Sequence, residues 1–247
     1  MFSRRAFTPT LACLLAALGG GARAASPVWV SHDIPPFLWR GAKGPEGYAF
    51  QLFQRVVKQA GVVADLHIYP WARAFRMLQT GQAHAALVVT RTFEREAQYR
   101  WLFPVGRFRY AVITRQPLGA VLGDLAALKS LRVGVLRASA AHSLLAATGV
   151  PQLVEGKDFN ELLALLNRGI VDAVFGPEPV LRTLDTRAGG EGVGITPIKQ
   201  AQEFYAVAGT TMSDDGAQRI RAAYQHLVDT GVVAQLRKTY PDAWFAD

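Results

Sequence analysis

Residues 131–147, LRVGVLRASAAHSLLAA, show in one stretch how the chain is built. Residues 132–136 form a short run rich in β-forming side chains, which predicts a strand. Ser139 follows and is a favoured first residue of a helix, so a helix reaching about residue 147 is predicted. A strand that leads through a short loop into a helix is the repeating unit of an α/β protein.

The same alternation extends on both sides of this stretch. Proline and glycine mark the boundaries, as where Pro70 precedes a helical pattern that stops before Gly81. Strands are predicted at residues 28–31, 62–69, 83–89, 110–114, 132–136, 171–175 and 204–208. Helices are predicted at residues 47–61, 71–79, 123–131, 139–147, 158–166, 179–184, 216–230 and 232–238, with a glycine-rich turn at 189–194.

The first 24 residues resemble a secretory signal peptide. Arg4 and Arg5 precede an apolar run at residues 11–18, and small residues at 22 and 24 form a cleavage site. We expect cleavage after Ala24 and export to the periplasm; a buried core helix is the alternative for this segment. Cleavage also removes Cys13, which is the single cysteine of the chain. The exported protein then has no disulfide, no thiol nucleophile and no thiolate metal site.

The charge of the chain argues against a nucleic-acid-binding protein. The formal charge of +8 includes Arg4, Arg5 and Arg23, so residues 25–247 keep 24 basic and 19 acidic side chains, a net charge of +5. These basic residues are scattered among acidic ones and form no continuous run, whereas a nucleic-acid face needs a basic stripe. A modest positive field favours anionic ligands or an anionic membrane surface.

Four motifs, in order, carry a family resemblance. They are the "P-W-x-R-A" segment at residues 69–74, the segments at 78–83 and 92–96, the "V-G-V" strand with Ser139, and the "L-x-x-G-x-x-D-A" segment at 166–174. Together they resemble the family 3 periplasmic solute-binding proteins of ABC transporters, of the polar amino-acid-binding type. The resemblance covers essentially all of residues 26–245.

The resemblance implies an α/β, two-lobed periplasmic-binding-protein fold of type II. In such a fold each lobe is a mixed sheet flanked by helices, and two chain segments form the hinge. Here it implies lobe one at residues 26–108 plus 204–247 and lobe two at residues 109–203. The two hinge segments then lie near residues 106–110 and 201–205. The chain has no Gly/Ser-rich linker, which agrees with short crossing strands rather than a flexible tether.

The resemblance also assigns ligand-binding residues. Arg95 matches the arginine that holds the ligand's carboxylate, because a guanidinium presents a planar fork of donors; the alternative is a surface salt bridge with Glu94 or Glu96. Ser139 matches a hydroxyl at a helix start, where it also serves as an N-cap. The remaining candidates are a polar contact, two aromatic walls that are alternatively core residues, and a carboxylate: Thr90, Trp71, Phe37 and Glu178.

The chain departs from the family where the ligand's ammonium group is usually bound. The acidic positions of the family fall here on Pro177, Ala49 and His84, and Glu178 is adjacent to the first of these. A buried cation without a partner costs several kcal/mol. We therefore expect a ligand with a net negative charge, or one that lacks a free amino group.

We expect a monomeric binding protein without catalytic residues, cofactor or metal. No G-x-S-x-G, Walker or G-x-G-x-x-G motif occurs, and the five histidines show no metal-ligand spacing. The expected partners are a small carboxylate ligand and, by resemblance, an ABC permease. Two alternatives remain: a ligand-sensing lobe pair that docks on a receptor, and a periplasmic dehydratase-like enzyme in which Glu178 acts as general acid or base.

Overall fold

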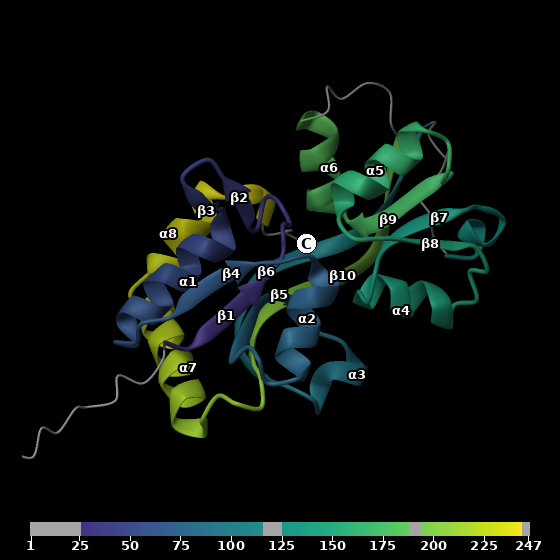
Figure 1. Ribbon diagram of the computed structural model, residues 1–247. Coiled ribbons are helices and arrows are strands. Elements are labelled where there is room, and N and C mark those ends of the chain that lie inside the picture. The colour runs from purple at the N-terminus through teal and green to yellow at the C-terminus, as the bar shows by residue number, and fades with distance from the viewer. Residues whose placement is uncertain (1–25, 116–124, 188–193, 244–247) are drawn as a thin grey trace, which may run out of the picture.

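Two long strands organise the computed structural model, which describes residues 26–115, 125–187 and 194–243. They are β6 (Arg100–Thr114) and β10 (Gly194–Ala208), and they pair antiparallel along most of their length. Within the described ranges they occupy the middle of an eight-stranded mixed sheet with the order β4-β1-β5-β10-β6-β9-β7-β8. Figure 1 shows both strands running from one group of helices and strands into a second group.

The first group contains the β4-β1-β5 end of the sheet. Here β1 pairs in parallel with both neighbours, and β10 continues the sheet beyond β5 as an antiparallel strand. The strands of this group are β1 (Val28–Ser31), β4 (Asp65–Ile68), β5 (Ala85–Thr90) and a hairpin of β2 (Trp39–Gly41) and β3 (Gly44–Glu46). Its helices are α1 (Tyr48–Gln59), α2 (Trp71–Gln79), α3 (Phe93–Glu96), α7 (Asp214–Asp229), α8 (Val232–Thr239) and a 3₁₀ turn at Pro241–Ala243.

The second group contains the β9-β7-β8 end of the sheet. Its parallel strands are β7 (Val133–Leu136), β8 (Leu153–Gly156) and β9 (Ala173–Pro177), and β9 joins them to the far half of β6. The helices are α4 (Ala140–Ala147), α5 (Phe159–Asn167) and α6 (Glu178–Arg187), preceded by a 3₁₀ helix at Leu125–Ser130. This group therefore has its own parallel strands and its own helices, as an α/β unit does.

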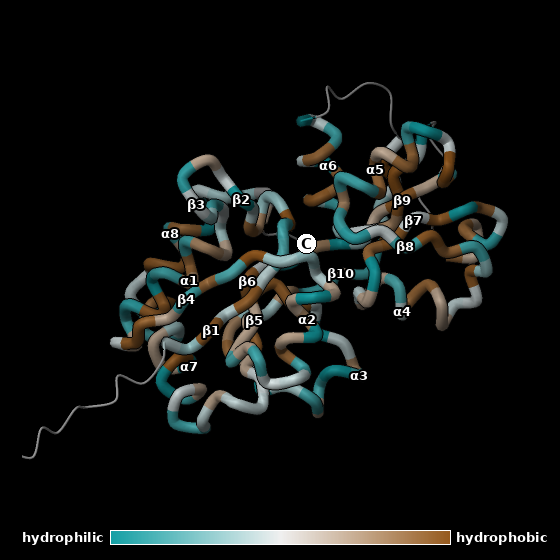
Figure 2. The backbone as a smooth tube through the Cα atoms, in the orientation of Figure 1, coloured by the Kyte–Doolittle hydropathy of each residue, from teal (hydrophilic) through white to brown (hydrophobic). Residues whose placement is uncertain are grey.

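The elements form where local chemistry favours them. All six residues of β5 are buried, as expected for an apolar strand covered on both faces, and its hydrophobic run is visible in Figure 2. Three helices begin at a residue whose side chain accepts a hydrogen bond from a free backbone N–H of the first turn: Ser139 for α4, Asp158 for α5 and Ser213 for α7. Helix α7 begins two residues before its predicted start at residue 216, so Asp214 and Asp215 lie in its first turn.

The predicted α/β fold is confirmed, but the two central strands were predicted far too short. Residues 110–114 and 204–208 are only the ends of β6 and β10. The missed parts contain Pro104, Gly106, Arg107 and Arg109, which break the apolar pattern of a buried strand. Pairing with the partner strand, and not an apolar run, keeps these residues extended. Strand β8 was missed as well, because it is only half-buried.

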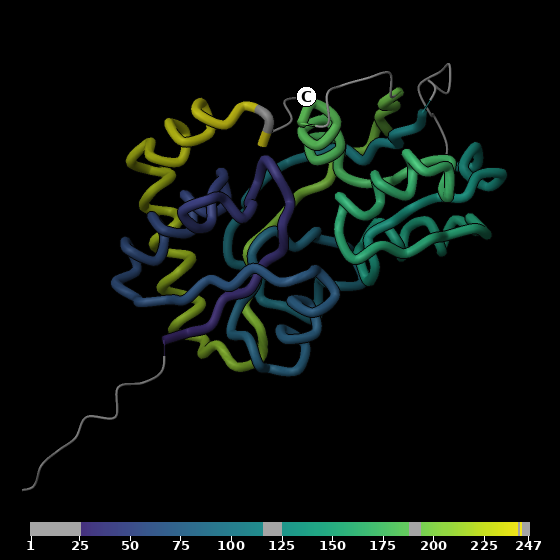
Figure 3. The backbone as a smooth tube through the Cα atoms, turned by 45° about the horizontal axis from the view of Figure 1, so that its top comes forward, coloured from purple at the N-terminus to yellow at the C-terminus, as the bar shows by residue number. Residues whose placement is uncertain are grey.

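The pairing of β6 and β10 is irregular in the middle. Ala111 pairs with Pro197 and Arg109 with Ala201, so three residues of β10 stand opposite Tyr110 alone. Such a bulge interrupts the ladder and bends the strand that carries it. Pro197 also lacks a backbone N–H and cannot donate to the ladder. The bulge lies where the two strands cross from one group to the other. Figure 3 shows this crossing of the two strands from a second direction.

Some predictions fall outside the described residues. The signal peptide at residues 1–24, Gly123 at the start of one predicted helix and most of the predicted glycine turn at 189–194 are among them. Of the helices that are described, none has the length and apolar character needed to cross a bilayer.

Candidate functional site

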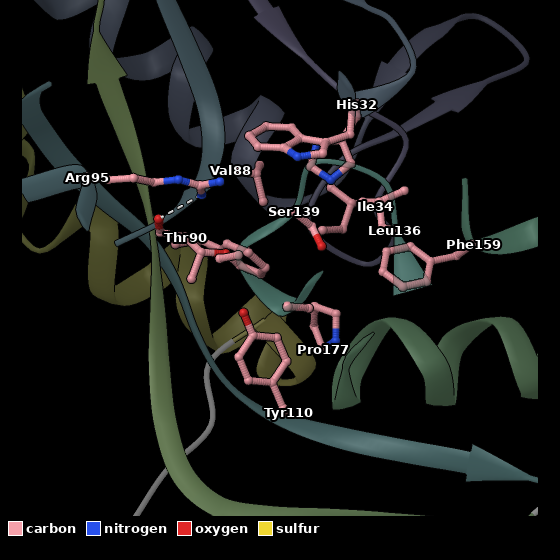
Figure 4. A pocket seen from close by; sticks show the side chains of 14 residues that line it. His32, Ile34, Val88, Thr90, Arg95, Tyr110, Leu136, Ser139, Phe159 and Pro177 are labelled. Carbon is pink, nitrogen blue, oxygen red and sulfur yellow. Dashed lines mark hydrogen bonds between the residues drawn. The ribbon is translucent and has the colours of Figure 1, made fainter. Parts of the chain in front are cut away.

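A cavity lies between the two groups of elements, and both groups line it (Figure 4). Its empty volume is about 360 Å³, part of which is open to solvent. The lining comes from the segment after β1, from β5, α2 and α3, from β6 and β10, and from the ends of β7 and β9 with α4 and α5. These residues are His32, Ile34, Trp71, Val88, Thr90, Arg95, Tyr110, Leu136, Ser139, Ala140, Ala141, Phe159, Pro177 and Phe204.

Arg95 is the charged side chain of this lining. It is only 8% exposed, and its Nη1 donates one long hydrogen bond of 3.3 Å to the carbonyl oxygen of Thr90. Its guanidinium carbon lies 4.6 Å from the ring centre of Phe75 and 5.8 Å from that of Trp71. Burial lowers the pKa of Arg95. Within the described part of the chain, no carboxylate lies within ion-pair distance of it.

Among the described residues Arg95 forms no salt bridge with Glu94 or Glu96, which was the alternative role for this arginine. Glu96 instead pairs with Arg91, with 2.6 Å between Oε1 and Nη2. Glu94 is exposed at the surface. The two acidic neighbours of Arg95 in the sequence therefore leave its buried charge without a partner.

Trp71 and Thr90 also lie in the lining. Trp71 is the first residue of α2 and is almost fully buried. Its indole Nε1 donates to the carbonyl oxygen of Ala138 at 2.9 Å, so this hydrogen bond joins the two groups of elements across the cavity. Thr90 ends β5 and is buried beside Arg95.

Ser139 combines its two predicted features. Its Oγ accepts a hydrogen bond from the backbone N–H of His142 at 3.1 Å, which makes it the N-cap of α4, and it also lines the cavity. The preceding Ala138 has a positive φ of 56°, a left-handed conformation that is uncommon for residues other than glycine. This turn brings the start of α4 to the cavity, opposite Arg95 in Figure 4.

Two titratable residues of the lining were missed by the sequence analysis. His32 follows β1 and is 5% exposed, its Nδ1 has no hydrogen-bond partner among the described residues, and its ring lies 4.8 Å from that of Trp71. Burial lowers the pKa of His32 to about 3, so the imidazole is neutral at physiological pH. Burial raises the pKa of Tyr110 to about 12, although a side-chain hydrogen bond with Thr90 and the charge of Arg95 oppose this.

The position of His32 in the sequence could have indicated that it lies in the site. It stands directly after a buried strand, and ligands of open α/β sheets bind beyond the carboxyl ends of the strands. Tyr110 gave no comparable signal, because the strand that carries it was predicted to begin there rather than to pass through the cavity.

Val88 is strained at the edge of the site. Its φ is +60°, which is an outlier for a β-branched residue. The register of β5 with β10 shifts at this place, between the pairs Tyr205–Val89 and Val207–Ala86. Strained backbone is often found at ligand sites, where the surrounding structure holds it in place.

Phe37 and Glu178 lie outside this cavity lining, so the structure corrects both assignments. Phe37 is fully buried, 5.0 Å from Phe204 in an edge-on contact, and a Cβ added to Gly106 would lie 2.4 Å from its Cε1. It is a core residue packed against β6. Glu178 accepts hydrogen bonds of 2.8 Å from Nε of both Arg109 and Arg182. Its carboxylate is therefore already bound by two arginines, and the adjacent Pro177 faces the cavity instead.

The chemistry of the described lining is that of a binding site for an anion. It offers a buried guanidinium, hydroxyl groups, a neutral imidazole and the start of a helix, but it includes no aspartate or glutamate. The described residues also hold no group of three or more metal-ligating side chains. The described lining can therefore bind a negative group, and it provides no counter-charge for a positive group beside it.

Solved structures with the same fold differ widely in sequence. A histidine kinase sensor domain similar to periplasmic binding proteins has a TM-score of 0.80 at 18% identity, covering 87% of this chain and 96% of that one. The arginine-, lysine-, histidine-binding protein ArtJ of Geobacillus stearothermophilus has a TM-score of 0.77 at 17% identity, covering 87% and 94%. The GluR0 ligand-binding core of Nostoc punctiforme, in complex with L-glutamate, has a TM-score of 0.74 at 18% identity, covering 87% and 99%.

These likenesses establish the fold as that of the type II periplasmic binding proteins. A comparison with curated protein sequences gives no match. The sequence model described as "Bacterial extracellular solute-binding proteins, family 3" matches residues 27–241, nearly the whole chain. The chain therefore belongs to the bacterial extracellular solute-binding proteins of family 3.

Proposed function

We propose that the chain is a periplasmic solute-binding protein that captures a small carboxylate-bearing ligand for an ABC permease. In this proposal residues 26–108 with 204–247 form one lobe, residues 109–203 form the other, and the lobes close on the ligand by a hinge motion. Arg95, Thr90, Ser139 and Trp71 bind the ligand. No chemical change of the ligand is part of the proposal.

The buried charge of Arg95 carries this proposal. An uncompensated buried cation costs several kcal/mol, and Arg95 has one long hydrogen bond to a carbonyl and no carboxylate partner in the described chain. A ligand carboxylate would supply the missing charge and accept two parallel hydrogen bonds from the guanidinium. The hydroxyl of Ser139 and the start of α4 face the same space.

The missing acidic side chains in the described lining favour a carboxylate without an ammonium group on the next carbon. An α-ammonium would lie in the same cavity as the carboxylate and close to a second cation, Arg95. The described lining has no aspartate or glutamate to balance it. This supports the expectation from the sequence that the ligand lacks a free α-amino group or carries a net negative charge.

Tyr110 supports a link between ligand binding and closure. It lines the cavity, and it is the residue of β6 that stands opposite the three-residue bulge of β10. Its ring stacks on Phe175 of β9 at 4.9 Å and meets Phe108 edge-on at 5.2 Å. A ligand in contact with Tyr110 therefore touches the segment about which the two lobes are proposed to rotate.

Ligand sensing is a second candidate function, because a histidine kinase sensor domain shares the fold with a TM-score of 0.80. In that case the closed lobes dock on a receptor instead of a permease. The dehydratase-like alternative has less support, since Glu178, on which it depended, is bound by Arg109 and Arg182. Genes for a permease and an ATPase beside this one would favour uptake, and a receptor gene would favour sensing.

A thermal-shift screen of small carboxylates, followed by calorimetry, tests the proposal on wild type and Arg95→Met. A ligand at about 100 times its dissociation constant should stabilise the wild type by about 2.7 kcal/mol. We expect Arg95→Met to lose this stabilisation. The matched control is Arg91→Met, four residues earlier, whose partly exposed side chain pairs with Glu96. Undiminished binding by Arg95→Met, or no carboxylate bound by the wild type, would contradict the proposal.

A further inference from the structure

The two sides of the Arg95 cavity differ in chemistry. Figure 4 shows Arg95 and Thr90, joined by a hydrogen bond, on one side. A ligand whose carboxylate binds Arg95 extends away from this pair, toward side chains that have no hydrogen-bonding atoms. Four such side chains are buried there, and we call them the apolar wall: Ile34, Leu136, Phe159 and Pro177.

The apolar wall forms only where the two groups of elements meet. Ile34 lies in the segment after β1 of the first group. The other three residues belong to the second group, where Leu136 ends β7, Phe159 begins α5 and Pro177 ends β9. A ligand that touches this wall therefore contacts both groups through apolar surface.

The hydroxyl groups beside the wall already have partners in the described chain. Oγ of Ser139 accepts the backbone N–H of His142 at 3.1 Å, and the hydroxyl of Tyr110 forms a hydrogen bond with the side chain of Thr90. An amide or a carboxylate placed against the wall would lose its hydration and gain few hydrogen bonds in return. A hydrocarbon body has no hydrogen bonds to lose, and its burial is favourable.

The described lining carries a single charge, that of Arg95. It includes no aspartate or glutamate, and burial lowers the pKa of His32 to about 3, so this imidazole is neutral. Its Nδ1 has no hydrogen-bond partner in the described chain and leaves room for one bond with an uncharged group. One carboxylate therefore balances the charge of the described lining, whereas a second carboxylate or an ammonium group would find no counter-charge in it.

The large aromatic rings on the two sides are fixed by their own contacts. A Cβ added to Gly176 would lie 2.6 Å from Cε1 of Phe159, so this ring packs directly on the backbone of β9. In the first group, the ring of Trp71 stacks on Phe75 at 4.9 Å, and its Nε1 donates to the carbonyl oxygen of Ala138. Rings held in this way present a permanent apolar surface, which favours a ligand body of the same character.

We infer that the ligand is a monocarboxylic acid with an uncharged apolar body, branched-alkyl or aromatic, whose carboxylate binds Arg95 and whose body packs on the apolar wall. This inference rests on the proposed function and specifies its ligand. It departs from the polar amino acids that the family resemblance implies. It is also narrower than the proposed function, which a dicarboxylate would satisfy equally well.

Calorimetry on the full chain tests the inference with acids of nearly equal size. 4-Methylpentanoate ends in an isopropyl group, which succinamate replaces with an amide and succinate with a second carboxylate. Leucine adds an α-ammonium group to 4-methylpentanoate, and 3-phenylpropanoate supplies an aromatic body. We expect 4-methylpentanoate or 3-phenylpropanoate to bind at least about 10-fold more tightly than succinamate, succinate and leucine. The Nδ1 of His32 can satisfy only one of the several hydrogen-bonding positions of the succinamate amide.

Pro177→Asp places a carboxylate in the apolar wall and so locates the ligand body. It should weaken binding of 4-methylpentanoate by at least about 10-fold and reduce the preference for this acid over leucine, whose ammonium group gains a counter-charge. The matched control is Pro151→Asp, at an exposed proline of the second group outside the lining. Urea unfolding of both variants is measured first, and the acid series on the wild type decides the inference if Pro177→Asp does not fold.

The outcomes separate this inference from the proposed function. If succinamate, succinate or leucine binds as tightly as the apolar acids, or if folded Pro177→Asp binds 4-methylpentanoate like the control, the inference is wrong and the carboxylate-binding function stands. A second charge on any other acid that the carboxylate screen finds contradicts the inference in the same way. If no acid binds at all, both fail. If the apolar acids bind most tightly and Arg95→Met loses them, both hold.

Discussion

Arg95 and Glu178 are both buried charges near the junction of the two lobes, yet their surroundings differ. Glu178 is 6% exposed and receives a hydrogen bond of 2.8 Å from each of two arginines, so its charge is fully compensated within the chain. Arg95 is 8% exposed and has a single long bond to a carbonyl oxygen. The charge of Glu178 is satisfied within the chain, whereas the charge of Arg95 has no carboxylate partner in the described residues, and this is the basis of its proposed role in ligand binding.

The comparison also explains why one residue next to the cavity is not in its lining. Pro177 ends β9 in the cavity, and Glu178 begins α6 one residue later. The Nε of Arg109, in the middle of β6, holds the carboxylate away from that space. Pro177 therefore lines the cavity while the adjacent Glu178 pairs with two arginines, and only the contacts of the two side chains reveal this difference.

The largest effect is expected from His32, whose Nδ1 has no hydrogen-bond partner in the described residues. Its pKa is lowered from 6.5 to about 3 by burial. As the pH falls below 6.5, the unfolded chain binds a proton that the folded chain does not, so the folded state loses stability until the pH reaches about 3. The loss is about 5 kcal/mol over this whole range and about 3 kcal/mol between pH 7 and pH 4. Denaturant unfolding of wild type and His32→Gln at pH 7 and pH 4 measures it.

The variant should show a distinctly flatter decline in the free energy of unfolding between these two pH values. A decline equal to that of the wild type would mean that His32 titrates normally and is not enclosed.

Glu178→Gln should have the next largest effect. It leaves Arg109 and Arg182 facing a neutral group, and breaking a buried ion pair costs about 3 kcal/mol or more. Because Arg182 is more than half exposed, we expect a loss at the lower end, about 3 kcal/mol, in urea unfolding. Ligand affinity should change little. A stable variant with lost binding would reverse the roles assigned to Glu178 and Arg95.

Trp71→Phe should have the smallest effect. It keeps an aromatic wall and removes the hydrogen bond from the indole to Ala138 across the cavity. One hydrogen bond is worth about 1 kcal/mol, which corresponds to about a five-fold weaker ligand affinity if the bond forms in the closed state. Trp101→Phe is the control, since its indole donates to Glu96 outside the cavity. Equal effects of both substitutions would exclude a specific role of the Trp71 bond in closure.

The sequence predicted the architecture well because its signals are local. The start of α4 at Ser139 and the extent of α2 follow from capping and proline chemistry. The motif around residues 92–96 pointed to Arg95, which lies in the cavity lining, and its role in ligand binding stays a prediction. The long strands β6 and β10 were missed, since their polar central residues are extended only through mutual pairing. Whether Phe37 and Glu178 face the cavity depends on partners distant in the sequence, Phe204 and Arg109. His32 belongs to no motif, and only the folded structure places its ring beside Trp71 in the cavity.

The pairing of β6 with β10 has a consequence for engineering. The chain enters the second group on one strand and leaves it on the hydrogen-bonded neighbour, so entry and exit are separated by only about 5 Å, the spacing of adjacent strands. A segment with such closely spaced ends can be cut out as a cassette. Grafting the equivalent segment of a relative at these two points would exchange one wall of the cavity, with Ser139 and Phe159, and leave Arg95 in its own framework.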